Sequence, residues 1–431
     1  MATHLYLSQS FPLRMVSFAV CYMAQGVPIG LLTIALPAWL AARGASAGDI
    51  AALIAITGLP WGFKLIAGPF MDRFAFPPMG RRRPWVIAAQ GGLTLAMLSL
   101  ITVTDPVEQL GTLIALGFVI NAFAAVQDVA VDGMAIDLLP ENERGRANAF
   151  MAFGQVAGFS AFGALNGFLL AHFGLPAAAL ASTAAVAVVF LLMTLIRERE
   201  GERLLPWSPG QAAPRAIAGG RSFAEIFKDL IRALLLPMSL VMIGVEFFSR
   251  AAMGIGISIF PIIAVQELGY SAAQYAYWMG IMGVISALVG LLFGPLIDRF
   301  GAARLLNAGI IGSAVAAAGF AAAVPLWGST PFVLAALVIS QTVSQLLFVA
   351  MIATFMGICW AKVAATQFAI YMSLANLSRS MGAALFALIA ADVSAAGALY
   401  IMAGLLIAAA VLLTWFDPVK HQQRVGALQS A

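Results

Sequence analysis

The chain has 431 residues, of which 62% are hydrophobic and 10% are charged, and its formal net charge is +4. A soluble domain has about 45–50% apolar and about 25% charged residues, so this chain has too few charges to cover a surface in water. The composition excludes an ordinary soluble enzyme, a disordered protein and a secreted disulfide scaffold. It indicates a polytopic membrane protein.

Twelve predominantly apolar runs are long enough to cross a bilayer, which takes about 20 residues. Backbone polar groups in lipid must be hydrogen-bonded within their own segment, so each run is expected to be a helix. The first run is too long for a signal peptide and is expected to remain as a span. The runs cover about residues 15–41, 48–70, 84–103, 110–137, 147–172, 176–196, 236–265, 272–297, 303–326, 331–358, 364–390 and 395–416.

Lysine and arginine residues set the predicted orientation, because they are enriched in cytoplasmic segments. With the N-terminus inside, 19 of the 23 lie in such segments, only Arg43 lies outside, and three lie within runs. We therefore expect a multi-pass protein of the cytoplasmic (inner) membrane with both termini in the cytoplasm. The basic residues act as membrane anchors, so they do not indicate nucleic-acid binding.

The longest connection divides the runs into two sets of six. It holds a Pro/Gly-rich stretch and then SFAEIFKDLIRALL, in which Ser222 and Glu225 form a capping box before apolar residues at helical spacing. This pattern predicts an amphipathic helix on the inner membrane surface. The expected domains are two six-helix bundles, residues 1–197 and 236–431, joined by a cytoplasmic linker, residues 198–235.

The two sets of runs share a short repeat. GPFMDRF follows the second run and GPLIDRF follows the eighth, so five of seven residues match at an offset of 226 residues. Two like halves in parallel register are typical of rocking-bundle transporters. Ion pairs in the repeat could latch one half against the other, or the repeat could be a tight turn with anchoring charges. The candidate gating residues are Gly68, Asp72, Arg73, Gly294, Asp298 and Arg299.

This repeat resembles the signature of the major facilitator superfamily, which Gly294, Asp298, Arg299, Gly301 and Arg304 match in spacing. Four further stretches, GLPWGFKLIAGPFMDR, GRRRPW, QDVAVDGMAIDLL and AATQFAIYMSLANLSR, resemble the branch that holds AmpG-type muropeptide permeases and acetyl-CoA transporters. The resemblance implies an all-α fold of twelve transmembrane helices in two pseudo-symmetric six-helix bundles. The branch also includes siderophore importers, so the resemblance leaves the substrate open.

Charged side chains inside the spans are the main candidates for function, because each costs at least about 2.5–3.5 kcal/mol at mid-bilayer. Lys64 and Asp128 lie at about 24 and about 27 Å from the outer ends of their runs, which predicts that they pair. The pair could be a static brace or a switch that a proton or a solute displaces. The six residues are Lys64, Asp128, Asp132, Glu246, Arg250 and Arg379.

Two relations among these residues follow from helical spacing. Asp128 and Asp132 share one helix face, and Glu246 and Arg250, also four residues apart, can neutralise each other. Arg250 and Arg379 are candidates for binding an anionic group through the guanidinium fork, or they are self-contained structural residues. Amides that could bind a polar solute, or could instead join helices, are Gln25, Asn121, Gln127, Gln341 and Gln345.

The sequence lacks a catalytic Ser/His/Asp set, metal-ligand spacing and a phosphate-binding loop, so we expect neither an enzyme nor a cofactor. The predicted function is secondary active transport by alternating access, coupled to protons, of a polar and anionic organic solute, with a muropeptide-like molecule as first choice. The alternatives are an importer of siderophores or of acyl or sugar conjugates with the same fold, and a non-transporting membrane assembly factor. The expected partners are the solute, protons and the lipid bilayer, and the protein is expected to be a monomer.

Overall fold

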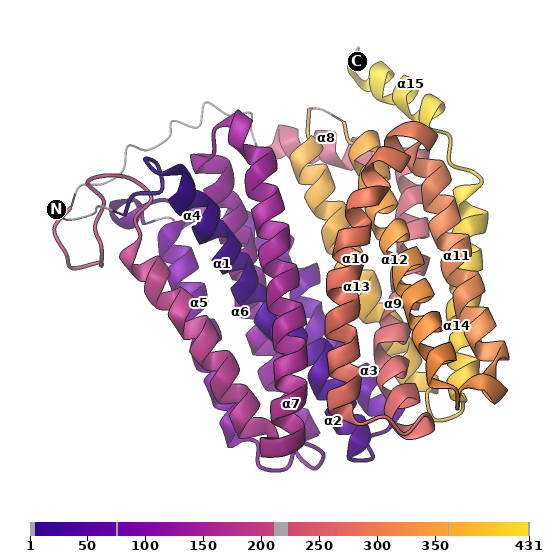
Figure 1. Cartoon of the computed structure of the whole chain (residues 1–431). Coiled ribbons are helices and arrows are strands. Elements are labelled where there is room, and N and C mark those ends of the chain that lie inside the picture. Colours follow the sequence, from indigo (N-terminus) through magenta and orange to yellow (C-terminus); the bar gives the residue numbers. More distant parts are fainter. Residues whose placement is uncertain (1–4, 75, 211–222, 361, 430–431) are drawn as a thin grey trace. The chain divides into compact units, whose positions relative to one another are not determined.

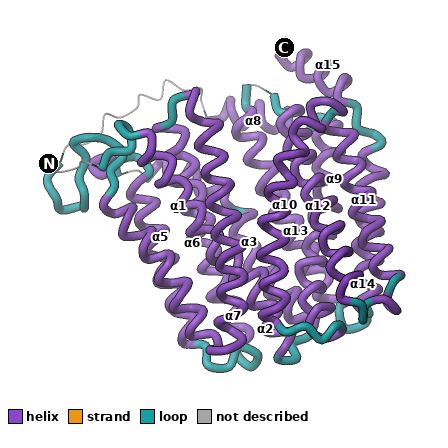
Figure 2. Tube along the Cα trace, in the orientation of Figure 1, coloured by secondary structure: helices purple, strands orange, loops and turns teal. Residues whose placement is uncertain are grey.

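The computed structural model describes residues 5–74, 76–210, 223–360 and 362–429, and this part of the chain is helical and contains no β-strand (Figures 1 and 2). The α-helices are α1 (Phe11–Gly30), α2 (Leu36–Ala42), α3 (Ala47–Gly62), α4 (Lys64–Arg73), α5 (Arg83–Ser99), α6 (Leu110–Leu138), α7 (Glu141–Leu195), α8 (Phe223–Leu234), α9 (Pro237–Ile262), α10 (Ala272–Phe300), α11 (Ala302–Ala322), α12 (Thr330–Ile358), α13 (Ala364–Ile389), α14 (Ala395–Leu413) and α15 (Pro418–Gln429).

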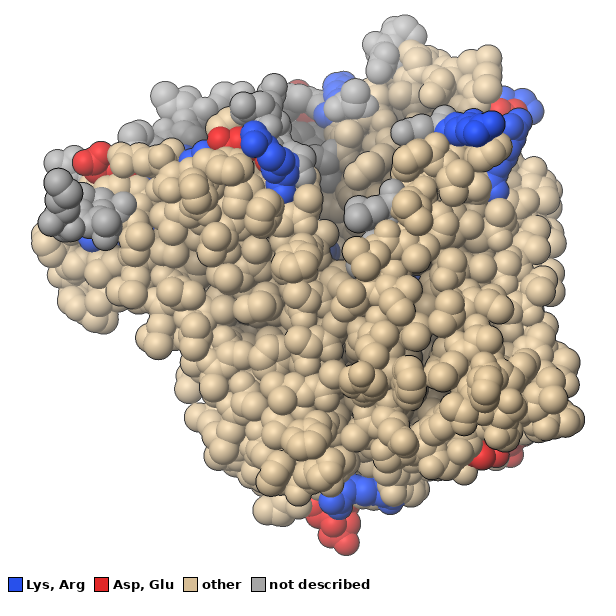
Figure 3. All heavy atoms as spheres, viewed as in Figure 1, with Lys and Arg blue, Asp and Glu red and all other residues tan. Residues whose placement is uncertain are grey.

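Ten helical stretches of the described residues are long and apolar enough to cross a membrane. One of them, Arg146–Leu195, is interrupted at Gly174, whose φ of 76° breaks α7, and the apolar helix Ala47–Gly62 is shorter. On the face drawn in Figure 3, Lys, Arg, Asp and Glu atoms lie near helix ends, and apolar or uncharged atoms cover the surface between. The prediction of an all-helical membrane protein is confirmed, and the count of twelve spans stays a prediction.

The chain folds as two compact units. The first comprises Met1–Ala45, Phe63–Ile217 and Gly269–Val284, and the second comprises Ser46–Gly62, Ala218–Leu268 and Ile285–Ala431. The run predicted at 48–70 is therefore divided at Phe63: α3 packs with α9 and α13 of the second unit, and α4 packs with α6 of the first. The sequence-based boundaries at residues 197 and 236 stay predictions.

Glycines bring α1 and α7 into backbone contact in the first unit. A Cβ atom on Gly26 would lie 2.6 Å from the Gln155 carbonyl oxygen, and one on Gly30 would lie 2.6 Å from that of Phe159. No real Cβ fits at such distances, so only glycine allows this packing. Helices in lipid have no hydrophobic drive to associate, and close contact of small residues supplies the attraction instead.

The first helices of the two halves of the chain share a local irregularity. Pro28 lies near the end of α1, which continues into the π-helical turn Leu31–Ala35, and Pro261 lies near the end of α9, which continues into the π-helical turn Ile263–Glu267. Proline lacks the N–H that an α-helical bond requires, so the hydrogen-bond ladder readjusts nearby. The correspondence is a second sign of an internal repeat.

The linker helix that the sequence predicts is present as α8. Phe227, Ile231 and Leu235, spaced four residues apart, are exposed, whereas Leu230 and Ala233 are buried. Ser222, the predicted cap, lies outside the described residues. The exposed apolar side is suited to the interfacial position that the sequence predicts.

Groups from α8, α13 and α15 hold the connection between α12 and α13. Asp229 of α8 pairs with Lys362 at 2.9 Å, and the His421 Nε2 atom of α15 lies 2.8 Å from the Ile358 carbonyl oxygen. Gln367, the glutamine of the AATQFAIYMSLANLSR stretch, accepts the Trp360 N–H at 2.8 Å and donates to the Tyr371 hydroxyl at 2.8 Å. The glutamine of this stretch thus braces the connection in this structure.

The GRRRPW stretch forms an anion-binding turn that the Glu198 carboxylate occupies. Its Oε1 atom accepts the backbone N–H groups of Arg82 and Arg83 at 2.7 and 2.5 Å, and its Oε2 atom accepts that of Arg81 at 3.1 Å. Gly80 turns the chain here with a φ of 104°, and a Cβ atom on it would lie 2.7 Å from the Glu198 Cδ atom. A carboxylate therefore caps the positive N-terminal end of α5.

Arg83 itself faces the other way and closes the end of α7. Its fully buried guanidinium donates to the carbonyls of Met193 and Thr194 in the last turn of α7, and to those of Arg203 and Leu204 in the following connection. The last carbonyls of a helix have no partner within the helix, so a fixed fork of donors suits them. One stretch thus joins the start of α5 to the end of α7.

Glu198→Gln is expected to lower stability, because the amide keeps one acceptor but turns an NH2 group toward backbone N–H donors. The loss should be about 1–3 kcal/mol, the cost of leaving buried donors unsatisfied. The measurement is the apparent melting temperature in detergent. The control is Glu200→Gln, since Glu200 is exposed; equal melting temperatures for both variants would contradict the role given to Glu198.

Glu202 makes the start of the connection after α7 sensitive to pH. Burial, and then the charge of Glu198, raise the pKa of the Glu202 carboxyl to about 7, although its Oε2 atom accepts the Arg199 N–H at 3.0 Å. The fold therefore favours the protonated form. Its stabilising contribution is complete below the unfolded pKa, about 4.3, and is lost as pH rises through about 7.

Hydrogen exchange of the segment 199–208 is expected to accelerate between pH 5 and pH 8 beyond the intrinsic pH dependence of exchange. Glu202→Gln should remove this extra acceleration, because the amide cannot ionise, and should slow exchange at pH 8 relative to the unaltered protein. Glu200→Gln serves as the control and should leave the dependence in place. Equal pH profiles for the unaltered protein and Glu202→Gln would contradict the assignment.

Candidate functional site

A polar cluster of four side chains lies within the first unit. The Lys64 Nζ atom of α4 is 2.9 Å from the Asp128 Oδ2 atom of α6, and the Tyr22 hydroxyl of α1 donates a short hydrogen bond to Asp132 of α6. Lys64 also interacts electrostatically with Asp132, and Tyr22 with both carboxylates. The four side chains form one connected network on three helices, which we call the acidic cluster.

Helix geometry explains how the acidic cluster forms. Asp128 and Asp132 are one turn apart on α6, so both carboxylates face the same neighbours. The helix break at Phe63, with φ of −94° and ψ of 4°, makes Lys64 the first residue of α4. A cation is unfavourable at the positive end of a helix, and the Asp128 carboxylate offsets this cost.

The charges of the acidic cluster do not cancel. Two carboxylates face one ammonium, and the fourth member, Tyr22, is an uncharged hydrogen-bond donor. The Asp128 side chain is 6% exposed and that of Lys64 is 20% exposed, so water compensates the surplus negative charge poorly. The cluster is balanced when it takes up one positive charge, and a proton is the smallest group that supplies it.

The candidate amides of the first unit are buried and mostly join helices. Gln127 donates through Nε2 to the Cys21 carbonyl oxygen at 2.7 Å, which ties α6 to α1. Gln155 of α7 donates to the Gln25 Oε1 atom at 3.4 Å, and Asn121 is buried on α6. Gln127 therefore supports the helix that carries Asp128.

A second polar cluster, which we call the basic cluster, lies within the second unit. The Arg250 Nε atom is 2.8 Å from the Glu246 Oε1 atom on α9, and the Arg250 guanidinium lies 5.1 Å from the centre of the Phe348 ring on α12. Arg379 of α13 interacts electrostatically with Arg250. Gln341 and Gln345 lie on α12, and Gln345 closely approaches Gly290 of α10.

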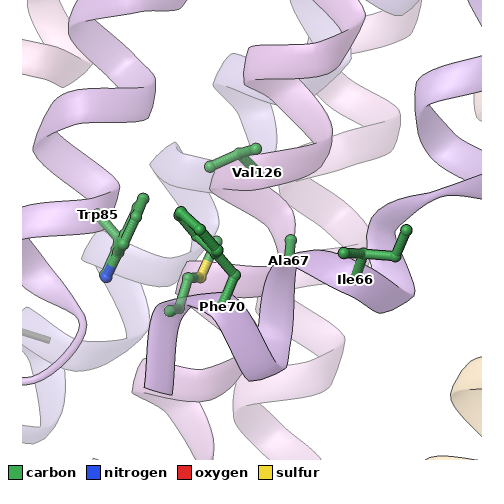
Figure 4. Close-up of a pocket in the computed structure, with 6 residues that line it drawn as sticks. Ile66, Ala67, Phe70, Trp85 and Val126 are labelled. Atoms are coloured by element: carbon green, nitrogen blue, oxygen red, sulfur yellow. The ribbon is translucent and has the colours of Figure 1, made fainter. Parts of the chain in front are cut away.

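A hollow between α4, α5 and α6 is not suited to a polar solute. Its volume is about 320 Å³, and the side chains that line it are apolar (Figure 4). Two of its lining residues, Ala67 and Val126, lie on α4 and α6, the helices that carry Lys64 and Asp128. The lining residues are Ile66, Ala67, Phe70, Met71, Trp85 and Val126.

The repeated motif ends a helix in both halves of the chain. Gly68, Asp72 and Arg73 lie on α4, and Gly294, Asp298 and Arg299 lie on α10, which stops before Gly301 with a φ of 86°. The side chains of Asp72, Arg73 and Asp298 lie outside the described part of the structure. The gating role of the motif stays a prediction.

A profile of the Major Facilitator Superfamily matches residues 18–253 and 242–430. The chain belongs to this superfamily. Its fold agrees: a D-xylose–proton symporter structure superposes with a TM-score of 0.72 at 15% identity, covering 94% of this chain and 98% of that one. The protein is therefore a multi-pass membrane transporter of the superfamily fold, as the sequence predicts.

Two of the curated relatives illustrate how much of the chain is matched. The anhydromuropeptide permease of Escherichia coli K12 is 27% identical over 277 residues, which is 64% of this chain and 53% of that protein. An uncharacterized protein of Haemophilus influenzae is 34% identical over 141 residues, 33% of each chain. The matched region thus spans about half of the permease and a third of the Haemophilus protein.

Sequence reasoning placed the charges of both clusters but missed Tyr22. The only signal was a tyrosine within the first apolar run, where a hydroxyl needs a hydrogen-bond partner. Its partner, Asp132, is 110 positions away in the sequence. Phe348 was likewise indistinguishable in the sequence from the other 28 phenylalanines.

Tyr22→Phe is expected to lower the apparent melting temperature, because Asp132 loses a charge-assisted hydrogen bond worth about 1.5–3 kcal/mol. Tyr277→Phe, a matched change at an exposed tyrosine of α10, should have little effect. The same Tyr22→Phe change in an Asp132→Asn background should cost less. Equal losses in both backgrounds would show that the hydroxyl does not act through Asp132.

Proposed function

We propose that this protein is a secondary active transporter of the cytoplasmic (inner) membrane that couples movement of a polar, anionic organic solute to protons. A muropeptide-like solute is the first choice, and the similarity to the E. coli anhydromuropeptide permease supports it. The protein works by alternating access, as a monomer, with both termini in the cytoplasm. The bias of lysine and arginine toward one side of the predicted spans supports that orientation.

The acidic cluster is the observation that carries proton coupling. It places one ammonium and two carboxylates in a single network on α4 and α6, with the ion pair of Lys64 and Asp128 at 2.9 Å. A permanently ionised cluster of this composition keeps a net charge in a medium that disfavours it. Uptake of one proton by a carboxylate removes that charge.

Protonation also supplies a mechanical step. When Asp128 takes up a proton, its ion pair with Lys64 is lost, and the ammonium can shift one helix turn toward Asp132, the carboxylate that stays ionised. Because Lys64 begins α4, this change acts at the break between α3 and α4. The contacts of α4 with α6 therefore differ between the protonated and ionised states, as a coupled transporter requires.

Asp128→Asn tests the proposal, because the amide keeps the shape of the side chain but cannot exchange a proton. In proteoliposomes, uptake of a radiolabelled anhydromuropeptide driven by a pH gradient is expected to fall to background. Solute counterflow without a gradient should persist, since it needs binding and rearrangement but no net proton movement. The matched control is Asp392→Asn, an exposed aspartate of the described chain.

Full gradient-driven uptake by Asp128→Asn, with an unchanged pH profile, would refute coupling through this residue. Uptake of a siderophore or an acyl or sugar conjugate in place of the muropeptide would select the alternative importer. If the unaltered protein moves none of these solutes under any gradient, the non-transporting assembly factor becomes the better assignment.

A further inference from the structure

Arg379 is a cation inside α13 that lacks a counter-charge in the described part of the chain. Among the described residues it has no hydrogen-bonding or ion-pairing partner, and the one charged side chain that acts on it is another arginine, Arg250, which repels it. Its position, 15 residues after Ala364, is in the middle of the 26-residue helix. A guanidinium kept there without a protein partner indicates that its partner is a ligand.

The packing of α9 on α13 holds Arg379 close to Arg250. The backbone of α9 at Gly254 directly meets the Arg379 carbonyl oxygen, and the backbone of α13 at Gly382 meets Ala251. Arg250 lies one turn before Gly254 on α9. The two arginines therefore project from touching turns of two helices, which places them together despite their mutual repulsion.

Arg250 is only partly neutralised by its own carboxylate. The Glu246 carboxylate accepts a hydrogen bond from the Arg250 Nε–H group. Among the described residues, the hydrogen-bond partner of the Arg250 Nη1 atom is the Met253 sulfur, at 3.6 Å. Across the basic cluster, two guanidinium groups face one carboxylate, so the surplus is one positive charge. The Nη donors of both arginines remain for an oxygen acceptor.

We propose that Arg379, together with the Nη atoms of Arg250, binds one carboxylate group of the transported solute. A planar guanidinium matches the two oxygens of a carboxylate in a fork-to-fork arrangement. A single negative charge balances the cluster, whereas a phosphate monoester, with about −1.5 to −2 charges, would leave it with a net negative charge. This inference rests on the proposed transport function and names the group by which the solute is held.

The stability of an Arg379 variant distinguishes a ligand-binding role from a structural one. Arg379→Gln removes a charge that has no partner among the residues that the structure describes, so without ligand its apparent melting temperature should equal or exceed that of the unaltered protein. Arg250→Gln should lower it, because Glu246 would lose its ion pair. A marked loss in Arg379→Gln would mean that Arg379 is a structural residue and would overturn the proposal.

Binding is tested directly with N-acetyl-D-alanine, its amide N-acetyl-D-alaninamide, and methyl phosphate, as titrations of the melting temperature of purified protein. The carboxylate is expected to raise the melting temperature saturably, methyl phosphate less so, and the uncharged amide not at all. Arg379→Gln should weaken the carboxylate affinity by at least about tenfold, the equivalent of one charge-assisted hydrogen bond. Arg424→Gln, a change at an exposed arginine, is the control.

Equal shifts with the carboxylate and its amide, no shift with either, or unchanged affinity in Arg379→Gln would each overturn the proposal. A larger effect of methyl phosphate would assign the site to phosphate esters instead. These titrations use no gradient and no transport. Carboxylate binding that depends on Arg379 would therefore stand even if Asp128→Asn disproves proton coupling, and a failure here would leave that coupling intact.

Discussion

Charge balance inside the membrane spans is the constraint on which this structure depends. An isolated charge in lipid is costly, so each ionised side chain within a span needs a partner in the fold, a proton or a ligand. Arg250 and Glu246 meet the requirement within one helix turn, and Lys64 and Asp128 meet it across two helices. Two residues have no ion pair of their own among the described residues: Asp132, which has the Tyr22 hydrogen bond and shares Lys64 with Asp128, and Arg379. These two are the strongest candidates for binding a proton or a ligand.

Close backbone packing makes these arrangements possible. Glycines on α1, α7, α9 and α13 let helix backbones touch, and touching backbones fix which side chains meet. The same contacts place Arg250 and Arg379 on adjoining turns, where their repulsion would otherwise drive them apart. At the helix ends, buried carboxylates hold segments together. Glu198 caps α5 by accepting three backbone N–H groups, and Asp229 pairs with Lys362.

The sequence was sufficient to predict an all-helical membrane fold, and to predict the ion pairs that depend only on position along a helix. Glu246 and Arg250 follow from helical spacing, and Lys64 and Asp128 follow from equal depth on two spans. The sequence did not predict contacts between distant segments whose relative depth in the membrane it does not give. Examples are the contact of Tyr22 with Asp132 and that of Gly80 with Glu198. It also missed the break at Phe63, because the apolar run continues through a residue whose backbone alone departs from the helix.

The two clusters have net charges of opposite sign, and this relation connects the proposal of proton coupling with that of carboxylate binding. The acidic cluster has a surplus of one negative charge and the basic cluster a surplus of one positive charge, so their sum is zero when both are empty. A proton on the first and a carboxylate on the second make each cluster neutral by itself. The loaded protein then keeps no surplus charge in either cluster, whereas loading only one cluster leaves the charge of the other. The two proposals together therefore predict symport of a proton with a carboxylate anion, because the doubly empty and doubly loaded states are the two in which the charges of the two clusters sum to zero.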